Sequence, residues 1–499
     1  MKQNNSKYFT QTLAIMVLSV IAFVLLKPFL PKKLFPEGKS MAKNIIVDSL
    51  MLDALADQED AITDSKAIIA SPEVYNYKFT EDDYVGYSNL VSFFEKLMKL
   101  EQSGSGKVRI AYFGDSMTDG DMIVQDVRTN FQDNFGGEGV GFVNITSESS
   151  ASRSSIKHES SKNWTSKSFV NTKTARAPFG VSGNVFFAND TNAVEWIKFE
   201  GSKYKHLNNL VNPTLYYGKS KNAKGKVAFI NGKDTVFKKL APNRLVNTLS
   251  LTSSYKNLKV NFISPDSIPF YGVSFEGENG VYVDNFSNRG NSGLPIINLN
   301  SDVLKQFNEH LHYDLIVLQY GTNVLNYGSL NFSWYEKKMK RVIEHLKQTM
   351  PNTAILVVSV GDKSTKYDTE MKTDSAVVPL VRSQLKYAQE SQVGFVNLFK
   401  LIGGEGTMVK WTEEEPAKSN KDYTHLNFRG AKVVSDLIYK KIISGYQQYK
   451  SQGSKNFTTK KDVSKPTGTV KDNVSLKKKD TLPKIIAKTQ TINTRVNAN

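Results

Sequence analysis

The segment Val108-Arg-Ile-Ala-Tyr-Phe-Gly114-Asp115-Ser116-Met117-Thr118-Asp119 decides the fold class of this chain. Its first six residues are mostly apolar and are typical of a short buried strand. The strand pattern stops at Gly114, the small hydroxyl residue Ser116 follows, and residues 122–131 have the spacing of a helix. A strand, a sharp turn with a serine and a helix place a hydroxyl at the carboxyl edge of an α/β sheet, where ligands bind.

Strand and helix patterns alternate again in the second half of the chain. Strands are predicted at residues 280–285, 314–320, 354–360 and 393–399, and helices at 301–312, 334–350, 376–392 and 427–449. A further helix at about 90–100 precedes the opening strand. This alternation predicts parallel strands joined by right-handed helical crossovers, that is, an α/β/α domain formed by residues 86–145 and 280–450.

Residues 146–279 have a different pattern of short alternating segments separated by Asn-Gly, Gly-Lys and Ser-Pro turns. Many short strands with such turns are typical of a β-sandwich, so we predict an all-β domain inserted into the α/β domain. Aromatic residues in short strands usually form sandwich core, with a sugar-stacking face as the alternative. The residues concerned are Trp164, Phe169, Trp196, Tyr216, Tyr217, Phe270 and Tyr271.

The N-terminus contains an apolar run at residues 8–30, preceded by Lys2 and Lys7. Because no small-residue cleavage motif follows closely, we predict an uncleaved signal anchor over residues 1–33, with a cleaved signal peptide as the alternative. Residues 34–85 are predicted as a linker with one helix at 46–55. A large domain behind a single anchor usually faces outward, which places it in the periplasm or at the cell surface. Residues 451–499 are predicted as a disordered basic tail.

Composition narrows the classes of function. The 499-residue chain has 39% hydrophobic residues, enough for real cores, and a net charge of +17, much of it in the tail. No nucleic-acid motif accompanies this charge. The tail lysines are predicted to be a solvated charge run, with contact to anionic wall polymer or lipid as the alternative. The chain has no cysteine, which excludes disulfides, a thiolate nucleophile and Cys-ligated zinc.

No metal-ligand spacing is present and no cofactor is expected. Away from His425, the histidines at 158, 206, 310, 312 and 345 are predicted to be surface residues.

Four short motifs follow predicted strands or precede the last helix. They are Gly114-Asp115-Ser116, Asn288-Arg-Gly290-Asn-Ser-Gly293, Gly321-Thr322-Asn323 and Asp422-Tyr-Thr-His425. A serine hydroxyl becomes a nucleophile when an imidazole accepts its proton, and a carboxylate holds that imidazole in one tautomer. A glycine N–H and an asparagine amide are suitable donors to the oxyanion of acyl transfer. The motifs together therefore predict an acyl-transfer site.

These four motifs, in this order, resemble the SGNH (GDSL-like) hydrolase superfamily, over residues 107–145 and 280–446. The resemblance implies a three-layer α/β/α domain with Ser116 as nucleophile and Asp422 and His425 completing the catalytic triad. It also implies an oxyanion hole formed by the N–H groups of Ser116 and Gly293 and by the Asn323 side chain. Gly290 is the alternative to Gly293. We expect Asp115 to brace the turn and to take no part in the chemistry.

A narrower resemblance is to the peptidoglycan O-acetylesterase branch, whose members carry a carbohydrate-binding-module-like β-sandwich between the first two motifs. It rests on Phe135-Gly-Gly-Glu-Gly-Val-Gly-Phe142, on Tyr320-Gly-Thr-Asn and on Gly403-Gly-Glu-Gly-Thr-Met-Val-Lys-Trp411. Two residues depart from that branch, Met117 after the serine and Val324 after the asparagine. Both are expected to lie near the substrate.

The resemblance implies a membrane-anchored serine esterase that removes O-acetyl groups from a cell-envelope polysaccharide, with peptidoglycan as the first candidate. One alternative is an O-acetyltransferase that uses the same triad on a glycan acceptor, beside a membrane-bound acetyl-transfer partner. The other is a non-catalytic glycan-binding scaffold. The residues do not distinguish hydrolase from transferase, because the difference is which nucleophile reaches the acyl-enzyme.

Overall fold

A computed structural model describes residues 85–171, 177–188, 194–327 and 330–453, together with 13–14, 16, 18–19 and 50–51. The predicted anchor, linker and basic tail therefore lie outside the described residues, apart from short pieces. Of these pieces, residues 13–14, 16, 18–19 and 50–51 are helical. Within the described ranges, none of the helices is both long and apolar enough to span a membrane.

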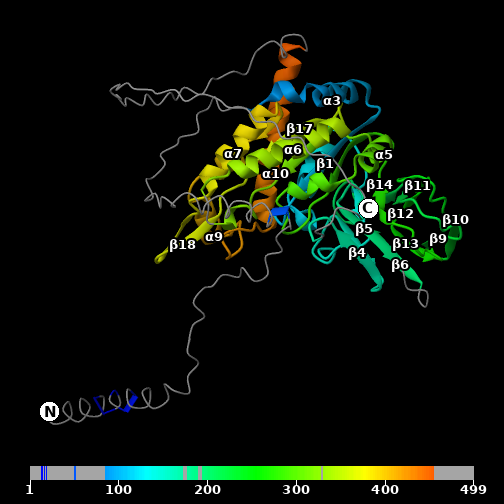
Figure 1. Cartoon of the computed structure of the whole chain (residues 1–499), viewed down its shortest axis with the longest axis horizontal. Helices are drawn as coiled ribbons and strands as arrows, with labels where there is room; N and C mark the ends of the chain where they lie inside the picture. The colour runs from blue at the N-terminus through cyan, green and yellow to red at the C-terminus, as the bar shows by residue number, and fades with distance from the viewer. Residues whose placement is uncertain are drawn as a thin grey trace, which may run out of the picture. The chain divides into compact units, whose positions relative to one another are not determined.

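The α/β part is built on a five-stranded parallel sheet in the order β15-β1-β16-β17-β20. Figure 1 labels two of these strands, β1 and β17. The strands are β1 (Lys107–Gly114), β15 (Gly280–Asn285), β16 (Leu315–Gln319), β17 (Ala354–Val358) and β20 (Gly394–Val396). Nearly every residue in them is buried, because helices cover both faces of the sheet. The predicted α/β fold with a parallel sheet is confirmed.

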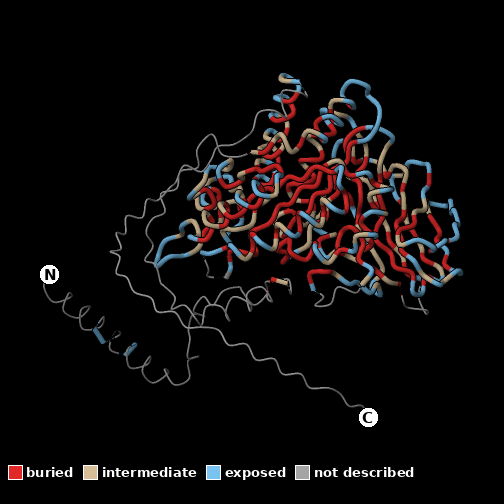
Figure 2. The backbone as a smooth tube through the Cα atoms, turned by 45° about the horizontal axis from the view of Figure 1, so that its top comes forward, coloured by how far each residue is buried: buried red, intermediate tan, exposed pale blue. Residues whose placement is uncertain are grey.

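Two sets of helices form the outer layers. One face is covered by α3 (Val91–Ser103), α4 (Val124–Phe135) and α10 (Phe428–Gln452), and the other by α5 (Ser301–Leu311), α6 (Ser333–Thr349) and α7 (Val377–Glu390). Side chains along β1 point alternately to the two faces of the sheet, and each face has its own apolar core. Ile110 and Tyr112 pack in the core beneath the first set of helices, and Ala111 and Phe113 in the core beneath the second. Figure 2 shows the resulting buried centre.

Shorter elements complete this part of the chain. They are η2 (Tyr87–Leu90), η3 (Asp119–Asp121), η4 (Leu294–Asn298), η5 (Leu325–Tyr327), the hairpin β18 (Ser364–Tyr367) and β19 (Glu370–Thr373), α8 (Leu398–Ile402) and α9 (Thr407–Glu413). Asparagine side chains begin two of the long helices, because Asn300 accepts the first free N–H groups of α5 and Asn427 those of α10. The helices predicted for the α/β part match the observed ones to within a few residues.

The insert consists of two antiparallel sheets of order β10-β9-β13-β6-β3 and β11-β8-β14-β5-β4, with a separate two-stranded ladder β12-β7. The strands are β3 (Ile156–Ser160), β4 (Trp164–Ser168), β5 (Asn184–Ala188), β6 (Glu195–Gly201), β7 (Leu210–Val211), β8 (Thr214–Tyr217), β9 (Lys226–Asn231), β10 (Asp234–Lys239), β11 (Asn247–Ser250), β12 (Ser254–Tyr255), β13 (Asn257–Ile263) and β14 (Phe270–Phe275). Side chains from both large sheets share one apolar core, including Phe199 and Phe229 from the first and Leu215 and Val273 from the second. This is sandwich packing.

The aromatic residues of the insert divide into two groups. Five of the seven named above are buried, and Trp164 and Trp196 are partly buried. Tyr216 and Tyr271 also pack against Phe307 of α5. These two side chains therefore join the insert to the α/β part through a shared core.

The junction begins earlier in the chain than the predicted boundary at residue 145. Strand β2 (Gly141–Asn144) pairs with β14 of the insert. Behind it, the fully buried Arg109 of β1 donates to Asp284 of β15 and to Glu276, which follows β14. A buried cation paired with two carboxylates thus crosses the junction.

Candidate active site

The predicted site residues lie at the carboxyl edge of the parallel sheet. Numbered by their order in the chain, the five strands are arranged 2-1-3-4-5 across the sheet. The connection after β1 therefore runs toward one edge of the sheet, and the connection after its neighbour β16 runs toward the other. In such sheets a crevice opens between the two strands, and ligands bind there. Ser116 follows β1 and Asn323 follows β16, so both lie at this position.

The turn that carries Ser116 is held by its neighbours. A Cβ atom on Gly114 would lie 2.0 Å from Thr118 Oγ1, so glycine is required there. Asp115 Oδ1 accepts a 2.9 Å hydrogen bond from the Met117 N–H, and its carbonyl accepts from the Thr118 N–H. Asp115 thus braces the turn, as expected.

The structure brings Ser116, His425 and Asp422 together in one hydrogen-bonded chain. Ser116 Oγ lies 3.0 Å from His425 Nε2, and His425 Nδ1 lies 2.8 Å from Asp422 Oδ2. Asp422 Oδ1 also accepts from the backbone N–H groups of Thr424 and His425, which fixes the carboxylate against the ring. With Nδ1 donating to Asp422, Nε2 is the free base facing the serine hydroxyl.

The electrostatics of the pair match this arrangement. The hydrogen bond that His425 donates to Asp422 raises the pKa of His425 above its ordinary value, against the effect of burial. Burial raises the pKa of Asp422, but the bonds from His425 and Thr424 outweigh it and the pKa is lowered. The side chains remain 40% and 36% exposed for His425 and Asp422, so water reaches this end of the chain.

Asp115 differs from Asp422 in its surroundings. It is 1% exposed, and burial raises its pKa to about 6, although the Met117 N–H, His425 and Thr322 each lower it. A carboxylate at this position adds negative charge beneath the imidazole and contributes to the raised pKa of His425.

The candidate oxyanion donors differ in whether their N–H groups already have hydrogen-bond partners. Asn323 is buried, and its Nδ2 donates to the Asn291 carbonyl at 3.1 Å, which orients the amide and leaves its second N–H available. The Gly293 N–H donates to Asn291 Oδ1 at 2.9 Å. The N–H groups of Ser116 and Gly290 have no hydrogen-bond partner within the described residues. Asn291, between the two glycines, is thus a site residue that the sequence analysis passed over.

Packing explains the glycine at position 293 independently of a donor role. Its φ is 91°, a left-handed conformation that side chains disfavour. A Cβ atom there would also lie 2.7 Å from Tyr320 Cδ2.

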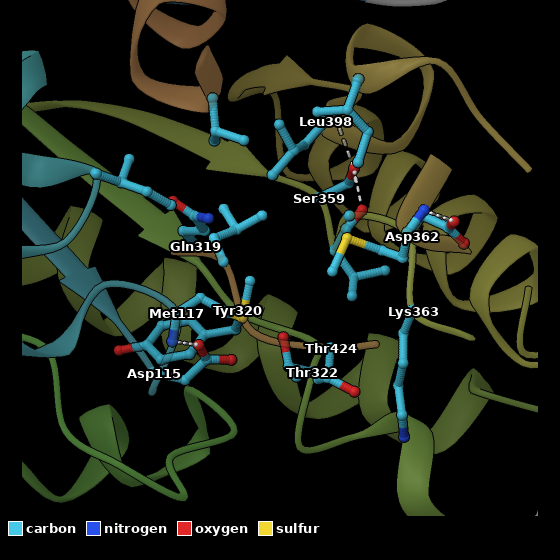
Figure 3. Close-up of a pocket in the computed structure, with 17 residues that line it drawn as sticks. Asp115, Met117, Gln319, Tyr320, Thr322, Ser359, Asp362, Lys363, Leu398 and Thr424 are labelled. Carbon is cyan, nitrogen blue, oxygen red and sulfur yellow. Dashed lines mark hydrogen bonds between the residues drawn. The ribbon is translucent and has the colours of Figure 1, made fainter. Parts of the chain in front are cut away.

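The two departures from the esterase branch are placed differently. Val324 directly follows Asn323, and its side chain is fully buried in the same apolar core as residues of α6 and α7. Met117 lines a small cavity of about 20 Å³ together with Asp115, Thr322 and Thr424 (Figure 3). This cavity has room for about one water molecule and is too small for a sugar ring.

The insert contacts the segment that follows Ser116 directly. Ser149 Oγ donates to Asp119 Oδ1 at 2.9 Å, and Arg153 Nη2 donates to Asp121 Oδ2 at 3.3 Å. Asp121 is buried and also forms a bidentate pair with Arg128 of α4. The sequence offered no periodic signal for these contacts, because they join segments with unrelated patterns.

The other histidines do not join the site. The surface prediction is wrong for His158, which is 7% exposed, stacks on Phe199 and has a pKa lowered to about 4 by burial. His345 is partly buried, and its ring lies 3.0 Å from the Leu299 carbonyl. Among the residues that the structure describes, no group of three His, Asp or Glu side chains is placed to hold a metal ion.

Comparison with known proteins identifies the fold. No protein-family model matches the sequence, and no curated protein does so either. A solved structure of a peptidoglycan O-acetylesterase superposes with a TM-score of 0.59 at 17% identity, over 73% of this chain and 99% of that one. A family two carbohydrate esterase from Cellvibrio japonicus matches more weakly, with a TM-score of 0.25 at 9% identity, over 59% of this chain and 98% of that one. The first of these likenesses shows that the chain shares the fold of that solved structure.

Proposed function

We propose that this protein is a serine esterase that removes O-acetyl groups from a glycan, with peptidoglycan as the first candidate substrate. The observation that carries the proposal is the continuous hydrogen-bonded chain from Ser116 through His425 to Asp422 at the carboxyl edge of the sheet. The shared fold with a peptidoglycan O-acetylesterase supports the choice of glycan.

In this mechanism Ser116 Oγ attacks the acetyl carbonyl carbon while His425 Nε2 takes the hydroxyl proton. The N–H of Ser116 and the Asn323 amide stabilise the oxyanion. The Gly293 N–H, which donates to Asn291 Oδ1 in this structure, becomes the third donor when it also donates to the oxyanion. The bond between the acyl carbon and the sugar oxygen then breaks, and His425 returns the proton to that oxygen. Water repeats the cycle on the acetyl-enzyme and releases acetate.

Solvent access favours water as the second nucleophile. His425 and Asp422 are more than a third exposed, whereas transfer to another acceptor requires that water be kept from the acyl-enzyme. We therefore favour hydrolysis over acetyl transfer.

The test uses the full-length chain in mild detergent with p-nitrophenyl acetate, butyrate and octanoate, followed by O-acetylated peptidoglycan. We expect acetate release that is abolished in Ser116→Ala and in His425→Ala. Activity that survives Ser116→Ala would disprove the mechanism. Acetyl transfer to an added glycan in preference to acetate release would make the protein a transferase, and the absence of both would indicate a non-catalytic glycan-binding scaffold.

We also propose that residues 1–33 anchor the protein in a membrane with the catalytic part on the outer side. The apolar run at residues 8–30 supports this location. Retention of the full chain in the membrane fraction at alkaline pH, with protease access to the catalytic part only from outside, would support it. Release after deletion of residues 1–33 is the matching control.

A further inference from the structure

Arg289 occupies the rim of the candidate active site. It lies in a turn closed by a 3.3 Å hydrogen bond from the Asn291 N–H to the Asn288 carbonyl. The Asn288 N–H donates to the Gly114 carbonyl at 3.1 Å, which fixes this turn beside the end of β1, two residues before Ser116. The backbone therefore places the turn that contains Arg289 beside the end of β1, which leads into Ser116.

The guanidinium group of Arg289 is oriented from one side only. Its Nε donates to Asp119 Oδ2 at 2.5 Å, and the other oxygen of Asp119 accepts from Ser149 Oγ of the insert. Asp119 is 14% exposed, whereas Arg289 is 55% exposed. Within the described part of the chain, neither terminal Nη group has a hydrogen-bond or ion-pair partner. The insert thus holds Asp119, and Asp119 holds a guanidinium group whose two outer nitrogens face solvent.

The charge of Arg289 reaches the reacting groups. Its positive field lowers the pKa of His425, against the larger raising effect of Asp422. The positive charge of Arg289 makes protonation of the catalytic imidazole harder and so opposes proton transfer from Ser116. This unfavourable effect argues that Arg289 has a role other than filling space at the surface. A planar fork of N–H donors in this place is suited to a carboxylate, which it binds in a bidentate way.

We propose that Arg289 forms an anion-binding subsite that receives a carboxylate carried by the sugar next to the acetyl ester. The preferred substrate is then an acidic O-acetylated glycan, such as one whose sugars bear a lactyl or peptidyl carboxylate, in contrast to a neutral acetylated glycan. This inference rests on the proposed esterase function. Lysine retains the charge but not the fork, so it should replace Arg289 only in part.

The experiment compares kcat/KM of the full-length chain on O-acetylated muramyl fragments, on the same fragments with their carboxylates converted to amides, and on neutral acetylated xylo-oligosaccharides. Arg289→Gln is expected to lower the ratio of acidic to neutral kcat/KM by about 10-fold, mainly through KM, with Arg289→Lys intermediate. The wild-type preference should also weaken between 50 and 500 mM salt. Arg244→Gln is the matched control, since Arg244 is 53% exposed and pairs with Glu309 at 2.8 Å.

An unchanged ratio of acidic to neutral kcat/KM in Arg289→Gln would overturn the subsite. If both values fall equally, Arg289 only supports the loop. If the wild-type chain hydrolyses none of the esters, the proposed function fails, and the subsite is then measured by binding. In that case, calorimetry compares the binding of deacetylated muramyl fragments by Ser116→Ala and by the double variant Ser116→Ala/Arg289→Gln. Weaker binding by the double variant supports the subsite, and equal binding refutes it.

Discussion

Replacement of Asp422 by asparagine tests the catalytic chain with little change in structure. Asparagine keeps the Oδ1 atom that accepts from the N–H groups of Thr424 and His425, so the loop geometry is retained. The change falls on the 2.8 Å contact to His425 Nδ1, where a carboxylate oxygen is replaced by an amide that donates. The ring then favours the tautomer with its proton on Nε2, which cannot accept the proton of Ser116.

The size of the effect follows from the contact and its exposure. Loss of a buried orienting carboxylate in such a triad costs about 10⁴-fold in kcat. Asp422 is 36% exposed, so water partly replaces its charge, and we expect about a 10³-fold loss of kcat, or about 4 kcal/mol.

The same variant changes the pH dependence of the reaction. The neutral imidazole is the base, so the rate rises as the pH passes the pKa of His425, which Asp422 raises above 6.5. Without the carboxylate this limb should move to lower pH. Initial rates of p-nitrophenyl acetate hydrolysis between pH 5 and 9 measure both effects.

Asp436→Asn is the control, because Asp436 is 35% exposed on α10 and pairs with Lys432. A loss below 10-fold in Asp422→Asn, or an acid limb that stays in place, would refute the assigned role of Asp422.

Three further changes have defined outcomes. Asn323→Ala removes an oriented oxyanion donor and should lower kcat by about 10²- to 10³-fold with little change in KM, as initial rates will show; a change in KM alone would contradict the role. Arg128→Met leaves the buried Asp121 carboxylate without its closest cation and should lower the free energy of unfolding by about 3–5 kcal/mol in urea titrations, whereas a loss below about 1 kcal/mol would contradict the pairing. Although burial raises the pKa of Glu276, Arg109 lowers it to about 2, so its stabilising contribution is complete above its unfolded pKa of about 4.3 and is lost as the pH falls toward 2. Urea titrations of Glu276→Gln should therefore show a flatter fall of stability over that range, and a curve identical to wild type would contradict the assignment.

Local patterns predicted the elements of the fold because each depends on neighbours in the chain. The apolar run at residues 108–113 indicates a strand because both faces of the sheet are covered, and helical spacing predicted α5 and α10. The contact between Asp422 and His425 was also predictable, since three residues span one turn.

Sequence patterns were least informative where distant segments meet. The place of Val324 directly after Asn323 does not reveal that its side chain is fully buried in the core. His158 was expected at the surface, but the sandwich core encloses it beside Phe199. In both cases burial is set by elements far along the chain, and no spacing rule reports it.

The sequence alone determined that this chain forms a parallel α/β domain with a β insert and carries the residue types of an acyl-transfer site. Only the tertiary structure decided that Ser116 and His425, 309 residues apart, lie 3.0 Å from each other. It also decided that the insert holds Asp119 and, through it, Arg289 at the rim. The physical reason is that strand periodicity and helix caps act over a few residues, whereas a crevice and the charges around it form only when strand order brings separate loops to one edge of a sheet.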